Sequence, residues 1–332
     1  EKKELYFGVG QIYEEQLDDL DRAIEVYTSV LDLDAEDALA LDALDRLYQQ
    51  GERWYDLLQI LEKQVELAGG ASVESIEFRH RIGSLWQLQL GDLARAVETY
   101  REVLAIDPTH LPSLQALDTL VHGEEEAVMA AQVLEPIYEQ AMEYDKLVAL
   151  YQILIEHSDD PLRRQELLHK VGEISDAHLE DGAAAFDAYA RAFRDDTGDE
   201  QAVLQLERLA EHIGAWEELA ALIEGEVDQV LDADQQVQLG LRVARIHVEE
   251  LGQPEQAITR YTLVMETDPT SREAVQSLDR LYTESEQWQE LAGVLRREIQ
   301  IAQSADDIED LQFRLGQLQQ DRLGDISAAV ES

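Results

Sequence analysis

The chain has 332 residues, 45% of them hydrophobic and only six of them proline, so it can bury a core and is not disordered by composition. It contains no cysteine, which excludes disulfides, thiolate catalysis and cysteine-ligated zinc. Its 72 acidic and 26 basic residues give a net charge of −46, which argues against nucleic acid as a partner. No apolar run approaches the length of a membrane-spanning helix, so we predict no membrane insertion.

The excess of acid has two interpretations. Carboxylates keep exposed helix faces hydrated, or they attract a basic partner. Lysine is scarce beside arginine, a bias that is also typical of proteins adapted to salt. We favour hydration of exposed faces, and the choice between salt adaptation and a basic partner stays open.

The first predicted element spans residues 4–77 and contains two helical hairpins of roughly 36 residues each. Its first half carries a small-residue anchor at Gly10, followed 13 residues later by Ala23 and then by Tyr27. Its second half carries a Leu-acid-Arg-Leu motif, followed by Trp54. Two hairpins make four helices in one unit.

The same anchors recur along the rest of the chain. Small residue, alanine and tyrosine repeat in the same register at Gly83, Gly172, Ala244 and Gly316, at Ala96, Ala185, Ala257 and Ala329, and at Tyr100, Tyr189 and Tyr261. The tryptophan recurs at Trp216 and Trp288. The pattern predicts further units at 78–166, 167–238 and 239–310, with a partial unit at 311–332. We expect one continuous array of about 18 helices, without strands, because no β-alternating run occurs.

The second unit is about 17 residues longer than the others, and the excess lies near 123–141, beside the acid run Glu124-Glu125-Glu126. We predict an extra helix there, with Pro136 starting or kinking it. A bend in the array, a docking feature and a simple insertion are the alternatives, and we favour the insertion.

These columns resemble the tetratricopeptide repeat, in the form found in bacterial α-solenoids. The first hairpins fit well, apart from one extra residue in the turn between their helices. The second hairpins fit less well, because Asp45, Glu207 and Asp279 stand where the family has glycine. The resemblance implies a right-handed α-solenoid. In it, Gly83 faces Ala96 at a close helix crossing, Tyr100 fills the gap toward the next hairpin, and the tryptophans pack in the core.

The resemblance implies a non-catalytic scaffold that binds a protein or peptide in its concave groove. Alternatives are a structural unit of a larger assembly or filament, with self-association through the solenoid ends, and the substrate-binding arm of an enzyme whose catalytic domain lies elsewhere. No phosphate loop, nucleophile elbow or His-x-x-x-His motif occurs, so we predict no cofactor and no metal. The chain opens on Glu1-Lys2-Lys3, which we interpret as a mature product or a fragment. Bacterial cytoplasm and periplasm are both open.

In the family, the residue after the anchor of the first helix of each hairpin faces the groove. Arginine holds this position at Arg46, Arg208, Arg245 and Arg280, and we expect the last three to form a row that binds an acidic or C-terminal peptide, with His212 and Glu249 nearby. The alternative is ordinary surface pairing along each helix, Arg208 with Glu211, Arg245 with Glu249 and Arg280 with Glu284. The family's carboxylate clamp requires asparagine, which this chain lacks.

Overall fold

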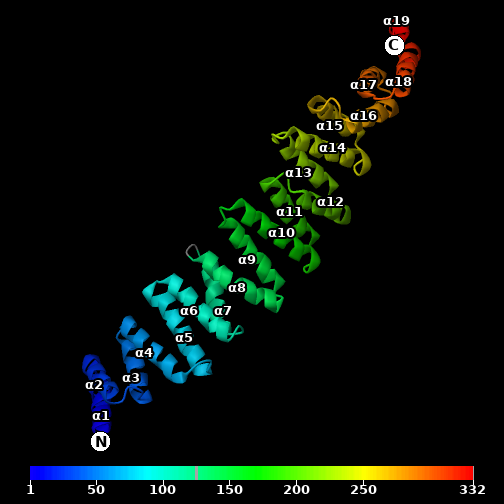
Figure 1. Cartoon of the computed structure of the whole chain (residues 1–332). Helices are drawn as coiled ribbons and strands as arrows, with labels where there is room; N and C mark the ends of the chain where they lie inside the picture. Colours follow the sequence, from blue (N-terminus) through cyan, green and yellow to red (C-terminus); the bar gives the residue numbers. More distant parts are fainter. Residues whose placement is uncertain (124–125, 332) are drawn as a thin grey trace. The chain divides into compact units, whose positions relative to one another are not determined.

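The computed structural model describes residues 1–123 and 126–331, and for Glu331 only the backbone. Over these residues the chain is all-α and contains no strand, which confirms the predicted fold class (Figure 1). Nineteen α-helices are present in the described part, close to the 18 expected. The chain divides into two compact units, Glu1–Asp159 and Asp160–Ser332. The repeat boundaries and the handedness of the solenoid stay predictions.

The first unit consists of nine α-helices and one π-helical turn. In chain order they are α1 (Lys2–Glu15), α2 (Leu20–Leu33), α3 (Ala38–Gln50), α4 (Trp54–Ala68), α5 (Val73–Leu85), η1 (Trp86–Leu90), α6 (Leu93–Ile106), α7 (Leu111–Val121), α8 (Ala127–Ala141) and α9 (Tyr144–Glu156). Each helix contacts mainly its neighbours in the chain, as expected of stacked hairpins.

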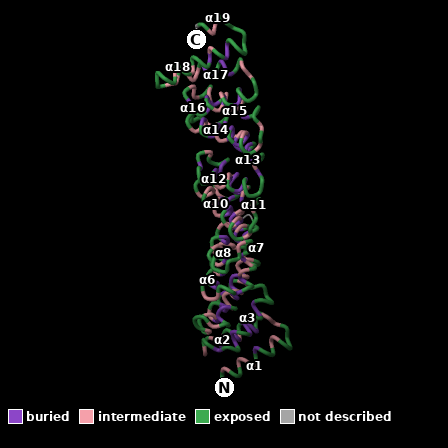
Figure 2. Tube along the Cα trace, turned by 90° about the vertical axis from the view of Figure 1, so that its right-hand side faces the viewer, coloured by how far each residue is buried: buried purple, intermediate pink, exposed green. Residues whose placement is uncertain are grey.

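The second unit repeats this arrangement with ten α-helices. They are α10 (Pro161–Ala177), α11 (Gly182–Asp195), α12 (Glu200–Ile213), α13 (Trp216–Val227), α14 (Ala233–Glu249), α15 (Pro254–Thr267), α16 (Arg272–Glu284), α17 (Trp288–Ile301), α18 (Ala305–Leu318) and α19 (Ile326–Glu331), with the π-helical turn η2 (Gln319–Leu323) before the last. Within each unit, the buried residues follow the helix-to-helix contacts and the exposed ones face outward (Figure 2).

In three of the first hairpins, the tyrosine packs on the anchor glycine of the same hairpin. A Cβ added to Gly83 would lie 2.6 Å from the ring of Tyr100, and one added to Gly172 would lie 2.6 Å from the ring of Tyr189. Gly10 and Tyr27 repeat this contact at 2.8 Å. The glycines are therefore needed to admit a ring, a contact that the expected glycine–alanine crossing does not include.

The alanine column and the tyrosine hydroxyls complete this crossing. Ala23, Ala96, Ala185 and Ala257 have no exposed surface. The Tyr100 hydroxyl donates to Gln87 Oε1 at 2.9 Å, and burial raises the pKa of Tyr100 to about 12. Tyr261 is also buried in its hairpin.

The extra residue in the first-hairpin turn has a structural cause. The backbone N–H of the residue that precedes the second helix donates to a carbonyl six residues back, which widens the last turn of the first helix. The five bonds, 2.7–3.0 Å long, run from Asp19 to Tyr13, Asp92 to Trp86, Asp181 to Ser175, Gln253 to His247 and Asp325 to Gln319. One added residue per turn is therefore a regular feature of this array.

The tryptophans lie at the edge of the core. Trp54, Trp216 and Trp288 are each the first residue of a helix, and each is half-buried. Trp54 and Trp288 pack against the core clusters of their units. The guanidinium of Arg322 stacks over the ring of Trp288, 4.8 Å from its centre.

The excess residues of the second predicted repeat include the helix α8. Pro136 lies inside this helix, so the expectation that it starts the helix is wrong. The helix packs between α7 and α9 and also contacts α6. Glu124 and Glu125 of the acid run lie outside the described residues.

Candidate functional site

The predicted groove arginines lie on the first helices of successive hairpins. In the second unit, Arg208 lies on α12, Arg245 on α14 and Arg280 on α16, and all three are exposed. In the first unit, Arg46 holds the same position on α3 and is also exposed.

Arg208 is bound to the preceding hairpin. Its Nη2 lies 2.5 Å from Asp176 Oδ2 of α10, and its Nε donates to Gln205 at 3.0 Å. A hollow of about 430 Å³ is lined by Asp176, Arg208, Glu211 and His212. The structure thus brings Arg208 and His212 together, as neighbours of one hollow.

The other arginines of the row differ in how they are paired. Arg245 Nε lies 3.2 Å from Glu273 of α16. Arg280 forms no ion pair with any described residue. The predicted same-helix pairs, Arg208 with Glu211, Arg245 with Glu249 and Arg280 with Glu284, are wrong, since none of them forms among the described side chains.

A single substitution explains why Arg280 is free. In the first repeat, Arg46 lies 2.5 Å from Glu14, which follows the Gly10 anchor by four residues. Asp176 follows the Gly172 anchor by four residues and pairs with Arg208 in the same way. The equivalent residue for Arg280 is Val248, whose side chain packs against the core instead.

The acids that replace the family glycine form a second series of ion pairs, which the sequence analysis missed. Asp45 accepts two hydrogen bonds from Arg81, both of 2.7 Å, so that α3 is joined to α5 of the next repeat. The equivalent pairs are Glu207 with Arg242 at 3.0 Å and Asp279 with Arg314 at 2.5 Å and 2.6 Å.

This series carries a sequence signal. Each acid is followed 35 or 36 residues later by an arginine that lies two residues before the next anchor. Hydrogen bonding to Asp45 raises the pKa of Arg81, and bonding to Asp279 raises that of Arg314. The acid at the glycine position therefore links one repeat to the next.

One cluster in the first unit has the residue types of a nucleophilic triad. Ser113 Oγ lies 2.9 Å from His110 Nδ1 and 3.0 Å from His80 Nδ1, and His110 Nε2 lies 3.6 Å from Glu77. Ser113 is completely buried, so its hydroxyl is closed to a substrate. His110 precedes α7 and caps it, and burial together with His110 lowers the pKa of His80.

Over the described residues, no group of three or more histidine, aspartate or glutamate side chains is placed to hold a metal ion. None of the described helices combines the length and the apolar composition needed to cross a bilayer.

Comparison with known proteins places two hairpins in a family. Residues 3–37 and 76–110 match the model described as tetratricopeptide repeat, and these ranges hold the α1–α2 and α5–α6 hairpins. A comparison with curated proteins finds no match to this chain.

Similar solved structures include three proteins of this repeat type. The tetratricopeptide repeat domain of P58(IPK) is 14% identical, with a TM-score of 0.26, and the match covers 97% of this chain and 100% of that one. A repeat protein from Parabacteroides merdae is 12% identical, with a TM-score of 0.26, and the match covers 95% of this chain and 98% of that one. The TPR2AB domain of yeast Sti1, solved with pHSP90, is 13% identical, with a TM-score of 0.27, and the match covers 99% of this chain and 98% of that one.

These likenesses are too low to carry an argument about this chain. The assignment depends on the two matched hairpins and on the anchor, alanine and tyrosine columns, which recur in the same register in the later hairpins. On that evidence the chain contains tetratricopeptide repeats at residues 3–37 and 76–110, and its later hairpins carry the same columns.

Proposed function

We propose that the chain is a non-catalytic scaffold that binds an acidic or C-terminal peptide along the row Arg208, Arg245 and Arg280. The observation that carries this proposal is Arg280, an exposed arginine without an ion pair among the described residues of a chain with a net charge of −46. A guanidinium can hold a carboxylate through two parallel hydrogen bonds. Arg280 would engage a peptide directly, whereas Arg208 and Arg245 would first release Asp176 and Glu273.

The test is the triple charge reversal Arg208→Glu, Arg245→Glu and Arg280→Glu. Binding of a fluorescein-labelled library of ten-residue acidic peptides with free C-termini is measured by fluorescence polarisation. We expect the dissociation constant to rise by about tenfold or more in the triple variant, because each reversal turns an attraction into a repulsion. Arg280→Glu alone should account for most of the loss.

The matched control is Arg296→Glu. Arg296 is an exposed arginine on α17, the second helix of the same hairpin as Arg280, and it forms no ion pair with a described residue. Equal losses in the Arg280 and Arg296 variants would mean that only net charge matters. Unchanged binding in the triple variant would place the peptide site elsewhere.

A second candidate function is self-association through the exposed apolar face of α1. Val9 and Ile12 of α1 are 41% and 46% exposed, whereas the equivalent Ile82 and Leu85 of α5 are 8% and 6% exposed. In α5 this apolar face packs beside the preceding helix, α4. The exposed face of α1 is equivalent to the α5 face that packs beside α4, so a second helical hairpin could cover it in the same way.

Sedimentation velocity over a range of concentrations tests this candidate. We expect an association that the double substitution Val9→Glu and Ile12→Glu abolishes, because two charges cannot be buried in an apolar contact without partners. The substitution Leu39→Glu, at another exposed leucine of the first unit, serves as the control. A chain that remains monomeric at high concentration rules the candidate out.

A further inference from the structure

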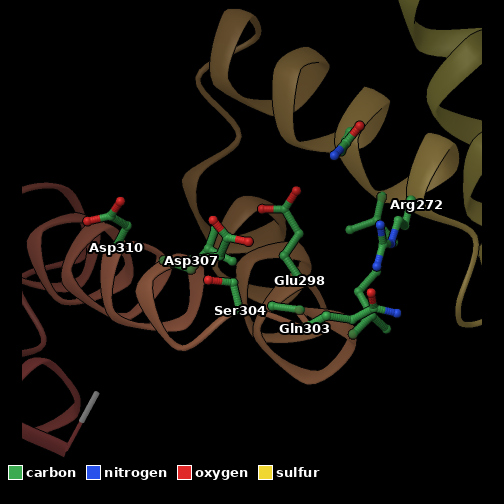
Figure 3. Close-up of a pocket in the computed structure, with 11 residues that line it drawn as sticks. Arg272, Glu298, Gln303, Ser304, Asp307 and Asp310 are labelled. Atoms are coloured by element: carbon green, nitrogen blue, oxygen red, sulfur yellow. The ribbon is translucent and has the colours of Figure 1, made fainter.

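A hollow of about 630 Å³ lies between α16, α17 and α18 of the second unit (Figure 3). Glu298 of α17 lies on its wall, and Asp307 and Asp310 of α18 face the same space. Arg272 of α16 is the only basic residue among those that line it. Its apolar lining comes from Val275, Ile301, Ala302 and Leu311.

Glu298 has an unsatisfied oxygen. Its Oε2 is buried and has no hydrogen-bond partner among the described residues. A buried acceptor without a partner costs free energy, because it has lost its hydrogen bonds to water and no protein donor replaces them. Burial raises the pKa of Glu298 to about 7, and the negative charge of Asp279 adds to this shift. The positive charge of Arg314 acts in the opposite direction and lowers the pKa.

The charges around the hollow favour a cation. Three carboxylates face it against one guanidinium, so the local potential is negative. Figure 3 shows the Glu298 carboxylate between Asp307 on one side and Arg272 on the other. Arg272 forms no ion pair with a described residue, so it does not neutralise the carboxylates of Glu298, Asp307 and Asp310.

The apolar lining suits a particular kind of cation. Lysine and arginine carry a charged head on a methylene stem, and such stems pack along apolar surfaces while the head reaches a polar group. The apolar side chains of Val275, Ile301 and Leu311 offer no ligand to a metal ion, which requires several converging oxygens.

We propose that this hollow binds a lysine or arginine side chain of a partner protein, with the cationic head on Glu298 and the methylene stem on Val275, Ile301 and Leu311. The site is independent of the arginine row, since it selects the opposite charge. Arg272 lies at the hollow as a like charge that opposes the binding of a partner's cation.

The test uses three capped tripeptides, acetyl-Gly-Arg-Gly-amide, acetyl-Gly-Lys-Gly-amide and acetyl-Gly-Gln-Gly-amide, titrated into the ¹⁵N-labelled chain at constant ionic strength. We expect the arginine or the lysine peptide, but not the glutamine peptide, to shift the amide signals of α16, α17 and α18. The stronger of the two basic peptides identifies the preferred head group. Equal shifts with the glutamine peptide would overturn the proposal.

Two substitutions should change binding in opposite directions. Glu298→Gln should weaken the basic peptide by about tenfold, because a charge-assisted hydrogen bond becomes a neutral one. Arg272→Gln should strengthen it, since a like charge beside the hollow is removed. Glu290→Gln, at an exposed glutamate in the first turn of the same helix, is the matched control and should change nothing.

Two further results keep this test separate from folding and from the proposed function. The melting temperature of Glu298→Gln should stay level or rise, because the substitution removes a buried charge without a partner. In the unmodified chain, binding should weaken as the pH falls below 7, since Glu298 takes up a proton. The triple arginine reversal should leave the basic peptide bound. Binding that survives both Glu298→Gln and low pH would refute the site.

Discussion

Tyr100→Ala is expected to lower the free energy of unfolding by about 3 kcal/mol, since it deletes a buried aromatic ring and leaves a cavity. The ring is 1% exposed, lies against Gly83, and donates its hydroxyl hydrogen bond to Gln87. Gly83→Leu should cost about as much by overpacking the same crossing. Urea unfolding followed by circular dichroism gives both values.

A matched pair of glycine-to-alanine substitutions separates the ring contact from helix propensity. In an open helical site, alanine is more favourable than glycine by about 1 kcal/mol. A Cβ at Gly293 meets nothing within 4 Å, whereas one at Gly83 would lie 2.6 Å from Tyr100. Gly293→Ala should therefore stabilise the chain and Gly83→Ala should destabilise it. The same sign for both would mean that the ring does not need the glycine.

The fold could be predicted from the sequence because its signals are local or recur at a regular spacing. The columns of Gly83, Ala96 and Tyr100 keep the same internal spacing of 13 and four residues, although the second unit is about 17 residues longer than the others. The spacing of the columns shows the extra turn residue. Its cause is a backbone hydrogen bond between the ends of two helices, and such a bond leaves no side-chain pattern in the sequence.

The charged contacts could not be predicted in the same way. Arg208 has Glu211 three residues on along its own helix, yet it bonds to Asp176 of α10, and only the packing of these two helices brings that carboxylate within reach. Glu298 is one of 72 acidic residues, and only the packing of α16, α17 and α18 distinguishes it. Pro136 was expected to start or kink a helix, and it lies inside α8, which contacts α6, α7 and α9.

Asp45→Gly should destabilise the chain by about 2 kcal/mol, although it restores the residue that the family has at this position. Glycine inside a helix is about 0.3 kcal/mol less favourable than aspartate, and the loss of a charge-assisted pair costs about 1.5 kcal/mol more. Asp45 is nearly buried and accepts both of its bonds from Arg81, whose own side chain is 39% exposed, so solvent screening limits the second contribution.

A double-mutant cycle separates these two contributions. In the background Arg81→Gln the pair is already broken, so Asp45→Gly should cost only about 0.3 kcal/mol, the part that is due to helix propensity. The difference between the two backgrounds is the coupling energy between α3 and α5. The cycle of Asp279 with Arg314 should give a similar value, because the pair joins α16 to α18 in the same geometry. A coupling energy near zero in both cycles would mean that the acid at the glycine position is held by something other than the next repeat.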